Sequence, residues 1–118
     1  MTYNPDVMKI GPTVEEGTRI PGVVIDIKEG KLSEFVSGEI TSKWKDADPQ
    51  QPVINVTMEA THEGNTFRKS QTINLPMGTN CHAKSKMARW IKLYKGAPKV
   101  GQKIEMMADQ NGYFQAFL

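Results

Sequence analysis

One helical segment between two groups of strand-like segments is the feature that most constrains how this chain of 118 residues can fold. Thr79 or Asn80 is a suitable N-cap for the helix, and Gly96 followed by Pro98 is typical of a helix end. The apolar residues of the segment recur at the spacing i, i+3, i+4 and i+7, namely Met87, Trp90, Ile91 and Tyr94. Because this spacing places them on one helix face, the sequence predicts that the face packs in the core with Trp90 buried.

Apolar and polar residues alternate with period two on both sides of the helix, which predicts strands. Three such segments precede the helix and two follow it: residues 20–30, 52–61, 66–76, 100–108 and 113–118. The first has its apolar side at Val23, Ile25 and Ile27. Turns are expected at Gly64-Asn65 and Asn111-Gly112. Residues 29–52 form a long polar connection, in which "EFVSGEIT" is expected to be a short strand or an extension of the first one.

Charge is divided unevenly along the chain, although the net charge is only +2. The segment from Gly64 to Ile104 contains nine basic residues and no Asp or Glu. The rest of the chain holds the other six basic residues and all thirteen acidic ones. A cationic segment of this kind favours an anionic partner, most often nucleic acid, over the alternative that its lysines serve only solubility.

The predicted elements follow the order strand, long connection, strand, hairpin strand, helix, strand, hairpin strand. Over residues 18–118, this order and the charge pattern resemble those of the OB-fold single-stranded nucleic-acid-binding proteins, without a short sequence motif in common. The resemblance implies a mainly β fold, a five-stranded Greek-key barrel with one helix between strands 3 and 4. SH3-like and other small barrels are the competing architectures. Residues 1–17 are polar and interrupted by Pro and Gly, which predicts a flexible N-terminal arm.

Patterns for catalysis, metal binding and membrane insertion are weak in this chain. His62 lies in a turn, and the adjacent residues Cys81 and His82 make no nucleophile–base pair. One Cys and two His fall short of the ~4 ligands of a zinc site. No apolar run approaches the ~18 residues that span a bilayer. A single cysteine agrees with a reducing compartment, which predicts a cytoplasmic protein. From the weak catalytic and metal-binding patterns, we expect a protein that is no enzyme and uses no cofactor or metal.

The resemblance implies a binding face on the second and third strands and on the loops that follow the first and fourth strands. In this sequence, those regions supply cations for phosphates, aromatic rings for bases and one amide: Phe35, Lys43, Trp44, Lys45, Asn55, Phe67, Arg68, Lys69 and Tyr113. Trp44, between two lysines, is expected to be a stacking platform rather than a loop anchor. Arg68 should point outward, whereas Phe67 shares the parity of Ile73 and is left undecided.

Together these patterns predict a largely sequence-independent single-stranded DNA-binding protein that acts in replication, recombination or repair. Two alternatives stay open: an RNA-binding OB fold, and a protein–protein interaction module whose basic face docks an acidic partner. The sequence leaves undetermined the preference for DNA or RNA and the oligomeric state, a homo-oligomer included.

Overall fold

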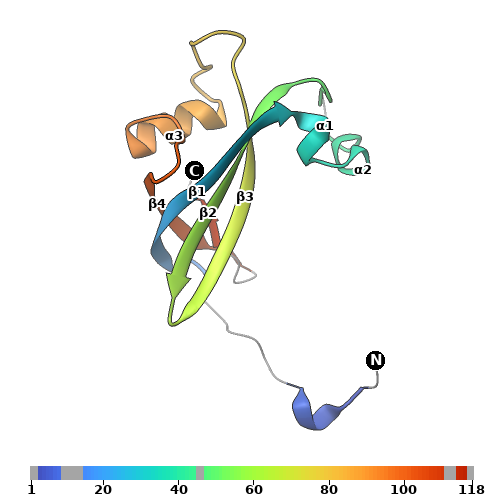
Figure 1. Cartoon of the computed structure of the whole chain (residues 1–118), viewed down its shortest axis with the longest axis vertical. Coiled ribbons are helices and arrows are strands. Elements are labelled where there is room, and N and C mark those ends of the chain that lie inside the picture. Colours follow the sequence, from blue (N-terminus) through green and yellow to red (C-terminus); the bar gives the residue numbers. More distant parts are fainter. Residues whose placement is uncertain (1–2, 9–14, 45–46, 111–113, 117–118) are drawn as a thin grey trace.

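The computed structural model describes residues 3–8, 15–44, 47–110 and 114–116 of the chain (Figure 1). Its elements are η1 (Pro5–Val7), β1 (Arg19–Lys31), α1 (Leu32–Phe35), α2 (Gly38–Thr41), β2 (Pro52–His62), β3 (Asn65–Asn74), α3 (Lys86–Tyr94), β4 (Lys103–Ala108) and β5 (Phe114–Ala116). The strands pair antiparallel in one sheet of order β3-β2-β1-β4-β5. The prediction of a mainly β fold is therefore confirmed. Within the described residues the sheet is open, so a closed five-stranded barrel stays a prediction.

The hairpin of β2 and β3 forms where the alternation predicts it. Its register pairs His62 with Asn65, so the two turn residues are Glu63 and Gly64 rather than Gly64 and Asn65. Both turn residues have positive φ angles, 51° and 79°, as a tight turn between twisted antiparallel strands requires. The core side of β2 is the expected one and consists of Ile54, Val56, Met58 and Ala60.

A register shift in β1 overturns the prediction that Val23, Ile25 and Ile27 share one apolar face. Val24 pairs with Met58 and the next paired residue is Asp26, opposite Thr57, so Ile25 is the extra residue of a β-bulge. Before the bulge, Val24 is the buried residue, and after it Ile27 packs against the core. The apolar–polar alternation of the sequence continues through the bulge, but the extra residue places Ile27 on the opposite face of the strand from Val23.

Helix α3 packs on the sheet through Met87 and Trp90, and the indole of Trp90 is fully buried. Trp90 Nε1 donates a hydrogen bond of 2.9 Å to Gln102 Oε1, which satisfies the one polar atom of the indole. The helix begins later than predicted, because its N-cap is Ser85, whose hydroxyl accepts from the Ala88 amide. Ile91, predicted to be in the core, is 37% exposed.

The connection from β1 to β2 holds two single-turn helices instead of the expected strand. The Ser37 side chain caps α2 by accepting from the Ile40 amide, which favours a helical turn over a strand at this point. The amide of Leu32 donates to the Gln51 carbonyl at 2.9 Å, so the two ends of the connection are joined at the sheet. This closure holds α1 and α2 together at one end of the sheet (Figure 1).

Within the N-terminal residues 3–8, Pro5–Val7 form one turn of 3-10 helix, η1, and every residue of this stretch is exposed. The chain joins the sheet from Gly17 onward, where the Gly17 amide donates to the Ala108 carbonyl at 3.0 Å. The predicted boundary between an arm of residues 1–17 and a domain of residues 18–118 stays a prediction. Among the helices of the described chain, none has the length and apolarity to cross a bilayer.

Candidate functional site

The outer face of the β2–β3 hairpin, on the side opposite the core, is covered by polar side chains. Three cross-strand pairs are hydrogen-bonded on it: Asn55 with Thr72 at 3.4 Å, Thr57 with Ser70 at 3.0 Å, and Glu59 with Arg68 at 2.7 Å. The alternation assigned Asn55, Thr57 and Glu59 to this face, and the structure confirms it. The result is a face of hydroxyl and amide groups with one ion pair.

The three candidate residues at the start of β3 do not share a face. Arg68 points outward as predicted, but its guanidinium is held by the Glu59 carboxylate. Phe67 lies opposite Ala60 and packs against the core, which settles its undecided side as the inner one. Lys69 lies opposite the buried Met58, so it belongs to the inner side of the hairpin rather than to its polar outer face. The cause is regular pairing through 65–74, because no bulge interrupts the register there.

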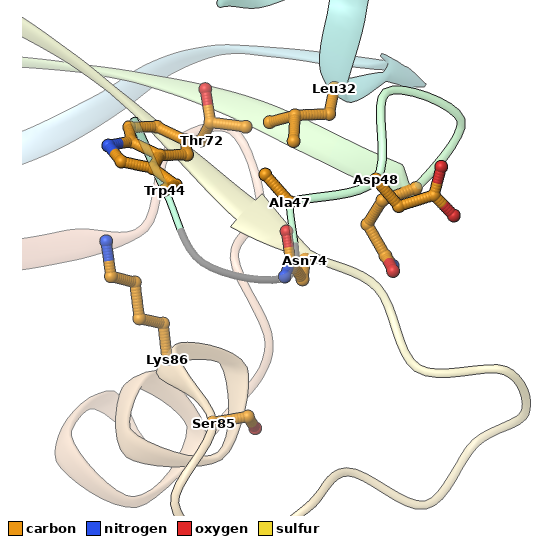
Figure 2. A pocket seen from close by; sticks show the side chains of 9 residues that line it. Leu32, Trp44, Ala47, Asp48, Thr72, Asn74, Ser85 and Lys86 are labelled. Atoms are coloured by element: carbon orange, nitrogen blue, oxygen red, sulfur yellow. The ribbon is translucent and has the colours of Figure 1, made fainter. Parts of the chain in front are cut away.

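Trp44 lies at the end of the α2 turn, beside the outer face of β3. Its amide donates to the Thr41 carbonyl at 3.0 Å, and its side chain is 50% exposed. Figure 2 shows the indole next to Thr72, at the rim of a groove of about 350 Å³. The groove is lined by Leu32, Trp44, Ala47, Asp48, Gln51, Thr72, Asn74, Ser85 and Lys86. Half burial means that Trp44 both packs on the protein and offers surface to a ligand.

The wall of the groove at Gln51 is joined by hydrogen bonds to the end of β3. Gln51 Nε2 donates to the Leu75 carbonyl at 3.1 Å, across 24 residues of sequence, and to the Pro52 carbonyl at 3.0 Å. The Leu75 amide in turn donates to the Pro52 carbonyl at 2.9 Å. On the same wall, Asp48 accepts a 2.9 Å hydrogen bond from the Gln50 amide. These bonds join the Gln51 end of the connection to the end of β3.

The other candidate residues have varied surroundings. Lys43 is exposed beside Trp44, as a phosphate contact requires. Phe35 is half-buried over β1, since a Cβ built on Gly30 would lie only 3.0 Å from its ring. The structure therefore makes Phe35 a packing residue of the connection more than a free platform. Lys45 and Tyr113 lie outside the described residues.

Sequence reasoning missed three residues of the groove: Thr72, Asn74 and Lys86. Thr72 and Asn74 carry the same outward parity as Arg68, so the alternation contained their signal. Lys86 belongs to the acid-free segment, but the helix was predicted to begin near residue 80, which concealed that Lys86 is its first residue. Beyond it, Arg89 and Lys92 are exposed on α3 and extend the cationic surface.

Tyr94, on α3 and away from the groove, has a shifted pKa. Burial raises the pKa of the Tyr94 phenol above its ordinary value of 10.0, although a hydrogen bond to the Glu105 backbone opposes the shift. The hydroxyl donates to the Glu105 carbonyl at 3.1 Å, which joins α3 to β4. Tyr94 also packs edge-on against Trp90, with ring centroids 4.9 Å apart. We assign Tyr94 a structural role.

Comparisons with protein-family models, with curated proteins and with solved structures found no match. Function is therefore inferred from the site alone. The structure defines a mainly β, antiparallel domain with a polar outer sheet face. At one end of that face, a half-exposed tryptophan and a lysine line the same groove.

Proposed function

We propose that this protein binds single-stranded DNA with little sequence preference, in the service of replication, recombination or repair. The observation that carries the proposal is the half-exposed indole of Trp44 in a groove beside the polar outer face of β3. An aromatic face stacks on any base at ~1–3 kcal/mol per base, and cations follow the phosphates. Both kinds of group are present here, since Lys43 is exposed beside Trp44 and Lys86 lines the groove.

The proposed fold is the OB barrel, closed by contact between β3 and β5. Support comes from the sheet order, which puts these two strands at opposite edges of one sheet with α3 between β3 and β4 in sequence. Closing a sheet into a barrel brings its two edge strands together. In such barrels the faces of strands 2 and 3, and the loops beside them, hold oligonucleotides. The groove at Trp44 lies in that region.

The chemistry of the groove favours a nucleic-acid strand over an acidic protein as the anionic partner. An acidic protein surface offers carboxylates to lysines but has no general need for a flat aromatic platform. A hydroxyl and an amide, Thr72 and Asn74, lie with Trp44 and suit the polar edges of bases. The free thiol of Cys81 is compatible with the proposed cytoplasmic setting.

The test is titration of the protein with oligothymidylate and oligouridylate at several salt concentrations. We expect quenching of the exposed tryptophan, because Trp90 is fully buried and Trp44 is half-exposed. With about four to six phosphate contacts, the plot of log affinity against log salt should have a slope of about −3 to −4. Competition between the two oligomers then separates DNA binding from RNA binding.

Two results would contradict the proposal. If the protein binds neither oligomer at low salt, a nucleic-acid partner for this groove is excluded. A salt slope near zero would exclude phosphate-dominated binding and favour a protein partner for the basic segment. Tighter binding of oligouridylate would keep the groove and change the ligand to RNA.

A further inference from the structure

We infer that the groove between the β1–β2 connection and α3 is a pocket for one nucleotide of the bound strand, with the base against Trp44 and the phosphate at Lys86. This inference rests on the proposed function and adds to it a site with two walls. The walls come from residues 44 and 86, which are far apart in sequence and meet across the end of β3 (Figure 2). Its volume of about 350 Å³ is within the ~300–1,000 Å³ of small-ligand sites.

The base side of the pocket is formed by Trp44 and by the outer residues of β3. Trp44 offers about half of its surface, while Thr72 and Asn74 follow it along the groove floor. The Thr72 hydroxyl is oriented by its 3.4 Å hydrogen bond to Asn55 Oδ1. The Asn74 side chain is exposed and carries both a donor and an acceptor. A side chain of this kind pairs with the mixed edges of different bases, so tolerance of sequence is expected.

The phosphate side of the pocket is set by charge. Lys86 is exposed at the first position of α3, and Figure 2 shows its side chain extending toward the side of the groove where Trp44 lies. Asp48, the acidic lining residue, lies on the opposite side of the groove (Figure 2). An anion is attracted by the ammonium group and repelled by the carboxylate. The phosphate is therefore placed at the Lys86 end, within reach of the Trp44 stack.

A second hollow indicates that the nucleotide belongs to a strand. It has a volume of about 250 Å³ and shares Gln51, Asn74 and Ser85 with the first groove. It continues past the end of β3 toward His82, which is exposed. A pocket for a free nucleotide would be expected to be closed at Gln51, Asn74 and Ser85, whereas this one continues there into space for a neighbouring unit. A free mononucleotide has the same chemistry, so the experiment must separate the two sources.

The experiment compares Lys86→Ala with Lys92→Ala, which removes the same charge ~9 Å further along α3 at an exposed position outside the groove. The probes are an oligothymidylate of ~12 nucleotides, inside the ~4–16 range of OB folds, and an abasic deoxyribose–phosphate oligomer of equal length. We expect Lys86→Ala to lower affinity about tenfold for both probes and the salt slope by about 0.7. Trp44→Ala should weaken only the probe that carries bases.

The double variant of Trp44 and Lys86 provides the second measurement. One nucleotide is expected to contact both residues. The fold loss of affinity in the double variant should therefore differ by at least about twofold from the product of the fold losses in the two single variants. Competition by thymidine monophosphate with the same sensitivity to Lys86→Ala would show that the pocket also accepts the free nucleotide. Absence of competition would show that it accepts the strand alone.

The inference is overturned if Lys86→Ala weakens binding no more than Lys92→Ala while the wild-type protein binds oligothymidylate. Multiplicative single effects in the double variant would equally contradict a shared nucleotide. Failure of the wild-type protein to bind either oligomer would be a different result, because it would remove the proposed function itself. Circular dichroism of each variant confirms that the α3 substitutions leave the fold intact.

Discussion

Replacing Trp44 by alanine is the most informative single perturbation of this protein, because it changes binding and stability by different amounts. Loss of one stacked base contact is worth ~1–3 kcal/mol, which corresponds to about 5- to 150-fold in the dissociation constant. The effect should appear at every salt concentration, since stacking releases no counterions. The slope of log affinity against log salt should therefore stay at its wild-type value.

The cost to folding follows from the half burial of the side chain. A fully buried aromatic side chain removes ~150–250 Å² from water, so Trp44, which is 50% exposed, removes about 100 Å². At ~25 cal/mol per Å², this is ~2.5 kcal/mol, and compactness of the unfolded chain lowers it to ~1.5–2 kcal/mol. Trp44→Ala should thus lower the free energy of unfolding moderately and leave the protein folded at 25 °C.

The assay is fluorescence anisotropy of a labelled oligothymidylate, together with urea denaturation of the same protein samples. Trp44→Phe is the matched control, since phenylalanine keeps an aromatic face and should retain most of the affinity. Wild-type affinity in Trp44→Ala would refute the stacking assignment. A loss of stability above ~3 kcal/mol would show instead that Trp44 is chiefly an anchor of the β1–β2 connection.

Two further predictions concern the packing of α3. Trp90→Ala should lower the free energy of unfolding, measured by urea denaturation, by ~3–5 kcal/mol. The reason is that it empties a fully buried site and removes the hydrogen bond to Gln102. Stability close to wild type would mean that α3 is not part of the core. Tyr94 has a raised pKa in the folded state, so its contribution to stability is present below the ordinary value of 10.0 and lost as pH rises through the folded value. Denaturation of wild type and Tyr94→Phe across this range should show a steeper alkaline loss for wild type, and equal losses would contradict the assignment.

Local sequence determined that the strands and the β2–β3 hairpin form and that Trp90 is buried, but not that Ile91 is exposed. In β2, period-two alternation separated the buried Val56 and Met58 from the outer Thr57 without any knowledge of the partner strands. This succeeds because side chains of a strand alternate between faces wherever pairing is regular. The same rule assigned Arg68 to the outer face. For Trp90, the helical spacing sufficed, since Met87 and Tyr94 at that spacing pack in the same core.

The bulge in β1 depended on two partner strands and so lay beyond local alternation. β1 pairs with β4 as far as Val23, and then the Val24 amide donates to the Gln102 carbonyl at 3.0 Å while its carbonyl accepts from Gly101 at 2.8 Å. Immediately after this point the register with β2 shifts by one residue at Ile25. No property of the β1 sequence alone specifies where the pairing with β4 must end.

The candidate site shows the same division between local and tertiary information. Composition and spacing placed Trp44 in a polar connection and gave the outer parity of Thr72, but neither could show that these residues adjoin Lys86. In the structure, a hydrogen bond from Gln51 to the Leu75 carbonyl, 24 residues away, joins the connection to the end of β3, and α3 begins at Lys86 after its N-cap Ser85. A groove depends on distances between segments, which alternation and composition do not encode. Local sequence therefore pointed to Trp44 and to a cationic segment, and only the tertiary structure places Trp44 and Lys86 in one groove.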